Sequence, residues 1–284
     1  MSPLGILWRG SLKSCNYACS YCPFAKRRPT PRALAADRRA LERFVDYVAT
    51  LRDWSLEILF TPYGEALIWP WYQEALSRLS RLPHLRRVAI QTNGSAPSEF
   101  LSDCDLSRLA LWVSWHPGEI AREVFRDKVI RLHEAGVRLS VGAVAISAHL
   151  PEVEALRRAL PTALPMWINA ERSARPYSSE AIARWSAIDP WFPLQADPSP
   201  SGGRPCLTGE SVVSIDASGT IRRCHFVDQA LGNLYTDDLS TLLADRPCPR
   251  PRCDCYIGYA HRPDLGLRAI YGDDLLCRIA PGQR

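Results

Sequence analysis

Three cysteines stand close together near the start of the chain, in the segment SCNYACSYCPFAKRR. Cys15, Cys19 and Cys22 are separated by three and then by two residues. Thiols this close cannot all be used in unstrained disulfides with one another, whereas their thiolates can hold a single metal centre. Because structural metal sites normally take four protein ligands, three thiolates indicate a centre with one position open to a substrate or cofactor.

This spacing, directly after the apolar run LGILW, resembles the Cys-x3-Cys-x2-Cys signature of radical S-adenosylmethionine (SAM) enzymes. The resemblance implies that Cys15, Cys19 and Cys22 hold a 4Fe-4S cluster whose open iron is chelated by SAM. It further implies that one electron from the cluster cleaves SAM to methionine and a 5′-deoxyadenosyl radical, which abstracts hydrogen from a substrate carbon. Tyr21, the aromatic residue before the last cysteine, is then expected against the adenine of SAM.

A zinc knuckle is the alternative interpretation of the same three thiols. Zinc in a structural site normally requires a fourth Cys or His nearby, and the first histidine after Cys22 is His84. The spacing therefore favours the iron–sulfur interpretation.

Residues suited to hold SAM follow three predicted strands, at the strand ends where α/β barrels place their chemistry. After 55–60 comes Tyr63-Gly64-Glu65, which resembles the Gly-Gly-Glu motif of the family, with Tyr63 in place of the first glycine. The resemblance implies that Gly64 and Glu65 hold the SAM ammonium group, and Glu65 can accept a charge-assisted hydrogen bond from that cation. Taken alone, the same pair is also compatible with an ordinary helix entry.

The other two strands end in residues that complete this expected set. Gln91-Thr92-Asn93-Gly94 resembles the Thr-Asn-Gly turn of the family, although Asn-Gly is by itself a common turn dipeptide. Ser114 stands where the family often carries a hydroxyl that contacts the ribose. The SAM contacts implied by the resemblance are Tyr21, Gly64, Glu65, Gln91, Asn93 and Ser114.

Two more polar residues follow strand ends without belonging to a motif. His116 could touch the substrate or move a proton, or it could be an ordinary loop histidine. Glu171 could bind a cationic substrate, or it could pair with Arg172 or Arg175 at the surface. The sequence leaves both pairs of alternatives open.

Strand-like and helix-like segments alternate over residues 4–170. Apolar residues at helical spacing, such as Leu41, Phe44 and Val48, mark the first helix. Strand–helix units in series predict an α/β fold with a parallel sheet, and the lack of a seventh and eighth unit argues against a closed barrel. The family resemblance implies an open partial (β/α)6 barrel of the TIM type. The predicted strands are 4–8, 55–60, 86–92, 109–115, 138–146 and 165–170, and the predicted helices are 34–52, 69–82, 119–134 and 150–160.

Beyond residue 170 the alternation is lost. The stretch 171–205 is rich in Pro, Ser and Gly and is expected to behave as a linker between domains. Six of the ten cysteines lie beyond it. The sequence therefore predicts two domains, a radical SAM partial barrel over 1–195 and a small α+β domain over 196–284.

The second predicted domain resembles the twitch extension of radical SAM enzymes, a shorter relative of the SPASM domain. Twelve residues lie between Cys206 and Gly219, and four between Gly219 and Cys224, with an alternating, hairpin-like stretch among them. The resemblance implies one auxiliary 4Fe-4S cluster. Its remaining expected ligands are Cys253 and Cys255, which lie on one tight turn.

This assignment leaves Cys248 spare. A thiol near a radical site can give up a hydrogen atom because its S–H bond is weak, and Cys248 is therefore the expected catalytic residue. The alternative is that Cys248 is a cluster ligand and that Cys253 or Cys255 is the bystander. Cys104 and Cys277 are expected to be structural thiols.

The layout as a whole is similar to that of the radical SAM epimerases of aminoglycoside biosynthesis: a cluster motif near the start, a twitch-like tail and a spare thiol. This resemblance implies epimerisation of a sugar carbon, with Cys248 returning the hydrogen. Because the cysteine motif begins at Cys15, no N-terminal peptide-recognition domain is expected, which favours a small-molecule substrate. A polycationic aminoglycoside is one such substrate, and an external one-electron reductant such as flavodoxin or ferredoxin is the second expected partner.

Three alternatives to the epimerase stay open at this point. The first is a radical SAM dehydrogenase of an aminocyclitol, and the second is a ribosomal-peptide maturase that forms a thioether or C–C crosslink. The third is a protein without catalytic activity, which would serve as an iron–sulfur or zinc scaffold or as an electron carrier.

Composition argues against several classes of partner. The net charge is only +5, and the cationic run Lys26-Arg27-Arg28 has no interleaved aromatic residues, so no nucleic acid is expected. No run approaches the ~18 apolar residues of a membrane span, and the N-terminus does not resemble a signal peptide. Ten cysteines without an export signal predict metal ligation in a reducing cytoplasm.

Overall fold

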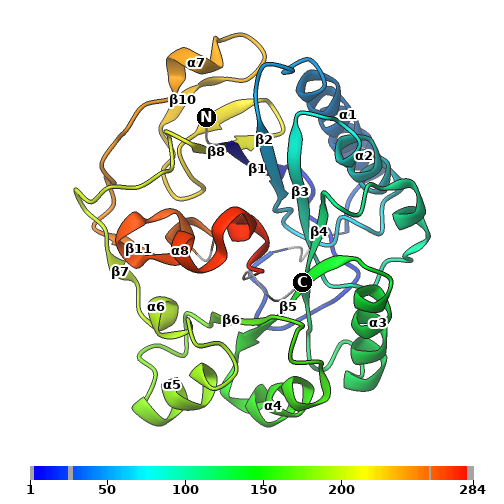
Figure 1. The fold of residues 1–284 in the computed structure, drawn as a ribbon, viewed down its shortest axis with the longest axis vertical. Coiled ribbons are helices and arrows are strands. Elements are labelled where there is room, and N and C mark those ends of the chain that lie inside the picture. Colours follow the sequence, from blue (N-terminus) through cyan, green and yellow to red (C-terminus); the bar gives the residue numbers. More distant parts are fainter. Residues whose placement is uncertain (1–2, 25–27, 256, 280–284) are drawn as a thin grey trace.

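The computed structural model describes residues 3–24, 28–255 and 257–279. Six parallel strands, each paired with the next one along the chain, form a curved wall (Figure 1). This arrangement confirms the predicted α/β partial barrel. The strands are β1 (Leu4–Gly10), β2 (Leu56–Phe60), β3 (Leu85–Thr92), β4 (Leu109–Ser114), β5 (Arg138–Ala145) and β6 (Met166–Ala170).

Amphipathic helices cover the outside of this wall (Figure 1). The first helix begins at Pro31 rather than at Leu34, because Thr30 caps it by accepting a hydrogen bond from Ala33 N (3.2 Å) and proline is favoured at the first helical position. No helix in the described part of the chain is long and apolar enough to span a membrane. The helices are α1 (Pro31–Val48), α2 (Pro70–Ser80), α3 (Arg122–Glu134) and α4 (Leu150–Ala159), with short 3-10 helices at η1 (Glu99–Asp103) and η2 (Ser147–His149).

Side chains alternate between the two faces of the wall, as the pleat of a strand requires. Leu7, Leu59, Ala89 and Ala110 share one row across β1 to β4 and belong to the cluster that fills the barrel interior. Their neighbours along the strands, such as Ile58, pack on the other face against the helices. Inward-facing residues near the strand ends are therefore the ones that can line a site.

The stretch predicted to be a linker is folded, and that prediction is wrong. After β6 it forms α5 (Ser179–Ser186) and α6 (Pro193–Ala196). Trp185 and Phe192 are fully buried in the same core as the barrel. The Pro- and Ser-rich composition is typical of a loop, although the segment contains these two large buried residues. Pro193 begins a helix here, because proline is favoured at the first helical position.

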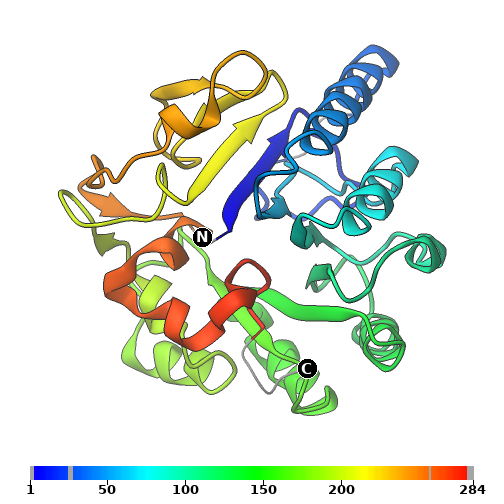
Figure 2. The same cartoon turned by 45° about the horizontal axis from the view of Figure 1, so that its top comes forward.

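The C-terminal part of the chain extends the same sheet. β8 pairs in parallel with β1, and β9 and β10 continue the sheet to nine strands, as Figure 2 shows in yellow beside the blue β1. Gly219 (φ +85°) closes the β8–β9 hairpin at the predicted turn. The division into domains at residue 195 stays a prediction. The elements are β7 (Ser199–Pro200), β8 (Val212–Asp216), β9 (Thr220–Arg222), β10 (Ala230–Asn233), α7 (Leu239–Leu242) and β11 (Arg252–Cys253).

The last described residues enter the barrel interior (Figure 1, red). Asp274 forms ion pairs with Arg87 (2.8 Å) and with Arg138, which lie near the starts of β3 and β5. Cys277 is fully buried, and its carbonyl oxygen accepts a hydrogen bond from Ser140 Oγ (2.9 Å). The elements of this segment are η3 (Gly258–His261), η4 (Pro263–Leu265), α8 (Leu267–Tyr271) and η5 (Gly272–Cys277).

Arg278 then places its guanidinium group among three aromatic rings. Its Cζ lies 4.7 Å from the ring centre of Trp112, 5.0 Å from that of Trp167 and 5.4 Å from that of Tyr259. The guanidinium also donates to Asn169 Oδ1 (3.2 Å). These contacts offset the backbone strain of a non-glycine residue at φ +52°. The last described residues are therefore packed into the barrel interior.

Candidate active site

The loop that carries the three cysteines (residues 11–24, here the cysteine loop) follows β1. Its start is fixed by Asp37, a buried carboxylate on α1. Asp37 Oδ1 accepts from Ser11 N (3.2 Å) and Ser11 Oγ (3.0 Å), while Oδ2 accepts from Trp71 Nε1 (3.2 Å). Both covering helices therefore hold the point at which the chain leaves the strand.

Gly64 passes directly under the cysteine loop. A β-carbon on this residue would lie 1.7 Å from the carbonyl oxygen of Ser14, and the same oxygen accepts a hydrogen bond from Glu65 N (3.0 Å). The position therefore requires glycine for close backbone approach. Its expected SAM contact stays a prediction, and sequence reasoning missed this steric requirement.

Glu65 joins the turns that follow β2 and β3. Its Oε1 accepts from Leu67 N (3.0 Å) and Thr92 Oγ1 (2.8 Å), and its Oε2 accepts from Asn93 N (2.5 Å). Complete burial raises the pKa of the carboxyl group to about 7, against the opposing effect of these hydrogen bonds. Glu65 thus holds together the two turns that were expected to contact SAM.

Asn93 reaches from the second of these turns to the cysteine loop. Its Nδ2 donates to Asn16 Oδ1 (3.0 Å) and lies 3.7 Å from Cys15 Sγ, while Asn16 Nδ2 donates to Ser95 Oγ (2.9 Å). Gly94 turns the chain at φ +72°. The Asn-Gly turn therefore carries a side chain that orients the first thiol.

On its far side, the cysteine loop contacts the loop that follows β4. The Tyr21 hydroxyl lies 2.8 Å from His116 Nδ1, and Ala18 N donates to Glu119 Oε1 (3.0 Å). Gln91 and Ser114 occupy inward-facing positions at the ends of β3 and β4 and are partly exposed. Of the residues predicted to bind SAM, Tyr21 thus lies in the cysteine loop and Gly64, Glu65 and Asn93 contact it. Gln91 and Ser114 share with them the strand-end edge of the barrel.

The three thiols fit an iron–sulfur cluster. All three are partly exposed; Cys22 N donates to Cys19 O (3.1 Å), and Cys15 interacts electrostatically with Cys22. Burial raises the pKa of Cys15, and raises that of Cys19 to about 11, so a metal would have to displace their protons. A 4Fe-4S cluster takes each thiolate on a different iron, so three thiolates leave its fourth iron open.

Four of the tail cysteines interact electrostatically. Cys206 and Cys255 are buried, and both interact with Cys224 and with Cys253. Cys248 is partly exposed, and its backbone N donates to Arg204 O (2.9 Å), two residues before Cys206. Which four of the five thiols bind the auxiliary cluster stays a prediction.

Asp254, between two of these cysteines, is clamped by arginines that follow β6. Arg175 Nη1 donates to Asp254 Oδ1 (2.6 Å), and Arg172 Nη2 donates to the Asp254 carbonyl oxygen (2.8 Å). Glu171, considered above as a partner of these arginines, has its Oε2 turned to its own loop, where it accepts from Ser173 Oγ (2.6 Å) and Ala174 N (2.7 Å). Sequence reasoning missed Asp254, whose only signal was its place within Cys-Asp-Cys.

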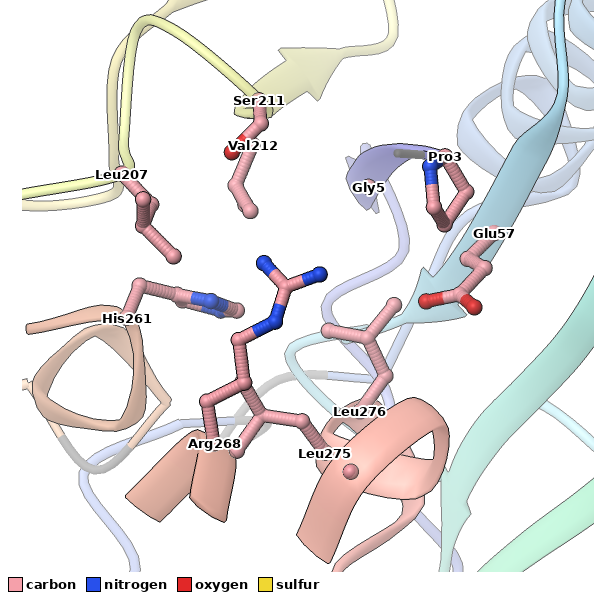
Figure 3. Close-up of a pocket in the computed structure, with 11 residues that line it drawn as sticks. Pro3, Gly5, Glu57, Leu207, Ser211, Val212, His261, Arg268, Leu275 and Leu276 are labelled. Atoms are coloured by element: carbon pink, nitrogen blue, oxygen red, sulfur yellow. The ribbon is translucent and has the colours of Figure 1, made fainter. Parts of the chain in front are cut away.

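A pocket of different character lies at the other end of the barrel (Figure 3). It is lined by Gly5 and Glu57, near the starts of β1 and β2, and by Arg268 of α8. His261 lines it as well; its side chain is buried, and neither ring nitrogen has a hydrogen-bond partner among the described residues. Because strand starts and strand ends lie on opposite edges of the barrel, this pocket is separate from the candidate active site.

Comparison with known proteins identifies the class. Residues 12–159, which include the three cysteines of the loop and the strands β2 to β5, match the family model "Radical SAM superfamily". The match spans more than half of the chain, and the protein belongs to this superfamily.

Two solved structures of anSMEcpe show the same fold at low sequence identity. The chain is similar to anSMEcpe with bound AdoMet, at 14% identity and a TM-score of 0.55, over 85% of this chain and 77% of that chain. The form of anSMEcpe with AdoMet and the Cp18Cys peptide matches at 15% identity and a TM-score of 0.53, over 85% and 80%. BtrN in complex with AdoMet and 2-DOIA is also matched, at 17% identity and a TM-score of 0.43, over 85% and 82%. No curated protein matches the chain.

Proposed function

We propose that this radical SAM enzyme is an epimerase, which inverts one carbon centre of a small carbohydrate substrate by taking a hydrogen atom and returning another. Membership of the superfamily supports the first half of this chemistry. The second half is supported above all by the cysteine count: a 4Fe-4S cluster takes at most four thiolates, so one of the five tail thiols near the proposed auxiliary site is left over, and we assign Cys248 to that role. A thiol that binds no iron can act as a hydrogen donor.

The proposal requires SAM and two 4Fe-4S clusters. When bound, the first cluster supplies the electron that cleaves SAM to methionine and a 5′-deoxyadenosyl radical. Cys15, Cys19 and Cys22 would hold this cluster, and Cys206, Cys224, Cys253 and Cys255 would hold the auxiliary one. The proposed SAM contacts are Tyr21, Gly64, Glu65, Gln91, Asn93 and Ser114.

The hydrogen balance of the proposed reaction is simple. One hydrogen atom passes from the substrate carbon to the deoxyadenosyl carbon, which leaves a substrate radical. The Cys248 S–H then gives its hydrogen atom to the opposite face of that carbon and becomes a thiyl radical. One electron and one proton would restore the thiol, and the external reductant would supply the electron. One SAM is consumed in each turnover.

The substrate and partners follow from the same layout. A small molecule would lie between the strand ends and the tail thiols, and a polycationic aminoglycoside would need carboxylates there. Glu119 and Glu171 are carboxylates in the loops beyond the strand ends. The cations Arg9 and Arg172, which lie over the rings of Tyr63 and Phe226, contribute charge of the opposite sign. A flavodoxin or ferredoxin is the proposed electron donor. None of the described cysteines forms a disulfide with another, and we propose a reducing, cytoplasmic location.

Turnover in deuterated water tests the donor. Thiol hydrogens exchange with solvent, so reconstituted, reduced enzyme given SAM and an aminoglycoside should place deuterium on the inverted carbon. Cys248→Ala should still form 5′-deoxyadenosine but release no epimer, whereas Cys104→Ala should behave as the parent enzyme. Unlabelled epimer, or epimer from Cys248→Ala, would reject the role proposed for Cys248.

The same assay separates the alternatives. A dehydrogenase would release a ketone without deuterium and would tolerate loss of Cys248. A peptide maturase would leave the aminoglycoside unchanged and would crosslink a precursor peptide. A scaffold or electron carrier would produce no deoxyadenosine at all.

A further inference from the structure

Tyr21, the aromatic residue between the second and third cysteines, contacts two histidines. The Tyr21 hydroxyl lies 2.8 Å from His116 Nδ1, and the two rings are within 17° of parallel with their centres 6.1 Å apart. His149, just before α4, meets the Tyr21 ring edge-on at 5.9 Å. Two loops of the barrel, after β4 and after β5, thus converge on one residue of the cysteine loop.

The imidazole of His116 is neutral near pH 7, because burial lowers its pKa to about 4 and outweighs the opposing effect of Glu119. A neutral imidazole carries one N–H, so the tautomer decides whether Nδ1 accepts from the Tyr21 hydroxyl or donates to it. The Tyr21 hydroxyl also interacts with the side chain of Cys19. In either tautomer the hydroxyl and Nδ1 share one hydrogen bond of 2.8 Å.

The position of this bond along the loop determines what it can control. Asp37, the Ser14–Glu65 contact and Asn93 all hold the half of the loop that leads to Cys15. On the other half, Ala18 N donates to Glu119 and Tyr21 pairs with His116, and both partners lie between β4 and α3. The loop after β4 is therefore the second anchor of the cysteine loop.

We propose that His116 is a positioning residue: through its hydrogen bond with the Tyr21 hydroxyl, it fixes the half of the cysteine loop that carries Cys19, Cys22 and the expected adenine contact. This inference rests on the proposed SAM-binding role of the loop. It gives His116 a task other than the substrate contact or proton transfer considered from the sequence. A hydrogen bond of this kind contributes about 1 kcal/mol, which corresponds to several-fold in affinity.

A double-mutant cycle on SAM affinity tests the proposal. Dissociation constants are measured anaerobically by calorimetry for reconstituted parent enzyme, Tyr21→Phe, His116→Leu and the double variant. Each single substitution should weaken SAM binding by roughly three- to tenfold, and the double variant should be no weaker than either. His116→Asn, whose side-chain amide can accept or donate near the place of Nδ1, should restore most of the affinity. His149→Ala, which removes a ring contact but no hydrogen bond, serves as the matched control.

Iron content and the electron paramagnetic resonance signal of the reduced cluster are recorded for each variant, so that a misfolded loop is recognised. Additive losses in the two single variants, or a His116→Asn variant as weak as His116→Leu, would overturn the positioning role. Parent enzyme that binds iron but neither binds nor cleaves SAM would instead overturn the proposed function.

Discussion

A β-carbon on Gly64 would lie 1.7 Å from the Ser14 carbonyl oxygen, closer than two atoms without a bond can approach. The obstacle is backbone rather than the end of a flexible side chain, so it cannot move aside without displacing Cys15. At the scale of single residues, this glycine is required by the path of the chain, whatever it also does for a bound cofactor.

Gly64→Ala should therefore displace the cysteine loop and cost at least about 3 kcal/mol of stability, the upper range for overpacking. We expect iron bound after anaerobic reconstitution to fall by about half, because one of two proposed clusters is lost. Gly202→Ala is the matched control, since the nearest atom to a β-carbon added there would lie at 3.4 Å. Full iron content and SAM cleavage in Gly64→Ala would show that the turn can relax.

Single residues also show what sequence reasoning can and cannot reach. The three cysteines can be found from spacing alone, because all three expected ligands lie within one short loop. The role of Asp37 cannot be found in the same way, since its partners Ser11 and Trp71 come from separate segments. Such contacts depend on tertiary distance, which local pattern does not encode.

At the scale of elements, the segment after β6 and the turn that carries Cys253 and Cys255 depend on each other. Arg175 is largely buried where it meets Asp254, and Arg172 adds a second contact to the same residue. Two guanidinium groups that share one carboxylate and one carbonyl oxygen define both the position and the direction of the turn.

Asp254→Asn should loosen this turn and so weaken the auxiliary site while leaving the first site intact. We expect about half of the bound iron to be lost more readily to a chelator, with SAM cleavage retained. Glu42→Gln, which breaks the exposed pair with Arg38, should leave iron retention unchanged. If Asp254→Asn releases iron no faster than the parent, the arginine clamp has no part in holding the tail thiols.

The elements themselves were largely predictable. Strand and helix alternate with clear periodicity through β6, and the predicted segments agree with the observed ones to within a few residues. The exception is the stretch with α5 and α6, whose helices are short and whose prolines imitate a loop. Its fully buried large side chains are Trp185 and Phe192. Two isolated aromatic residues form no periodic pattern that would predict a helix.

At the scale of the whole molecule, the C-terminal segment closes the start-of-strand side of the barrel. Asp274 is 2% exposed and pairs with Arg87 and Arg138, from two different strands. No pattern in the sequence near Asp274 pointed to partners more than a hundred residues away, so this contact could not have been predicted.

Asp274→Asn should be strongly destabilising, because it leaves two buried guanidinium groups without their carboxylate. Breaking a buried pair in this way costs roughly 3–5 kcal/mol. Asp46→Asn, which breaks a surface pair with Arg78, should cost at most about 1 kcal/mol. Urea denaturation under reducing conditions measures both; equal midpoints for the two variants would contradict the inferred role of the segment.

The contacts of the cysteine loop have a consequence for how the protein is made. Every hydrogen-bonding anchor described for it, from Asp37 to Glu119, is translated before residue 120, whereas β1 receives its second neighbour only when Val212–Asp216 emerges. Chains fold from the N-terminus while they are being synthesised. The proposed first cluster site can thus be assembled on the nascent chain before the tail thiols emerge, so that it need not compete with the proposed auxiliary site for the same iron–sulfur delivery step.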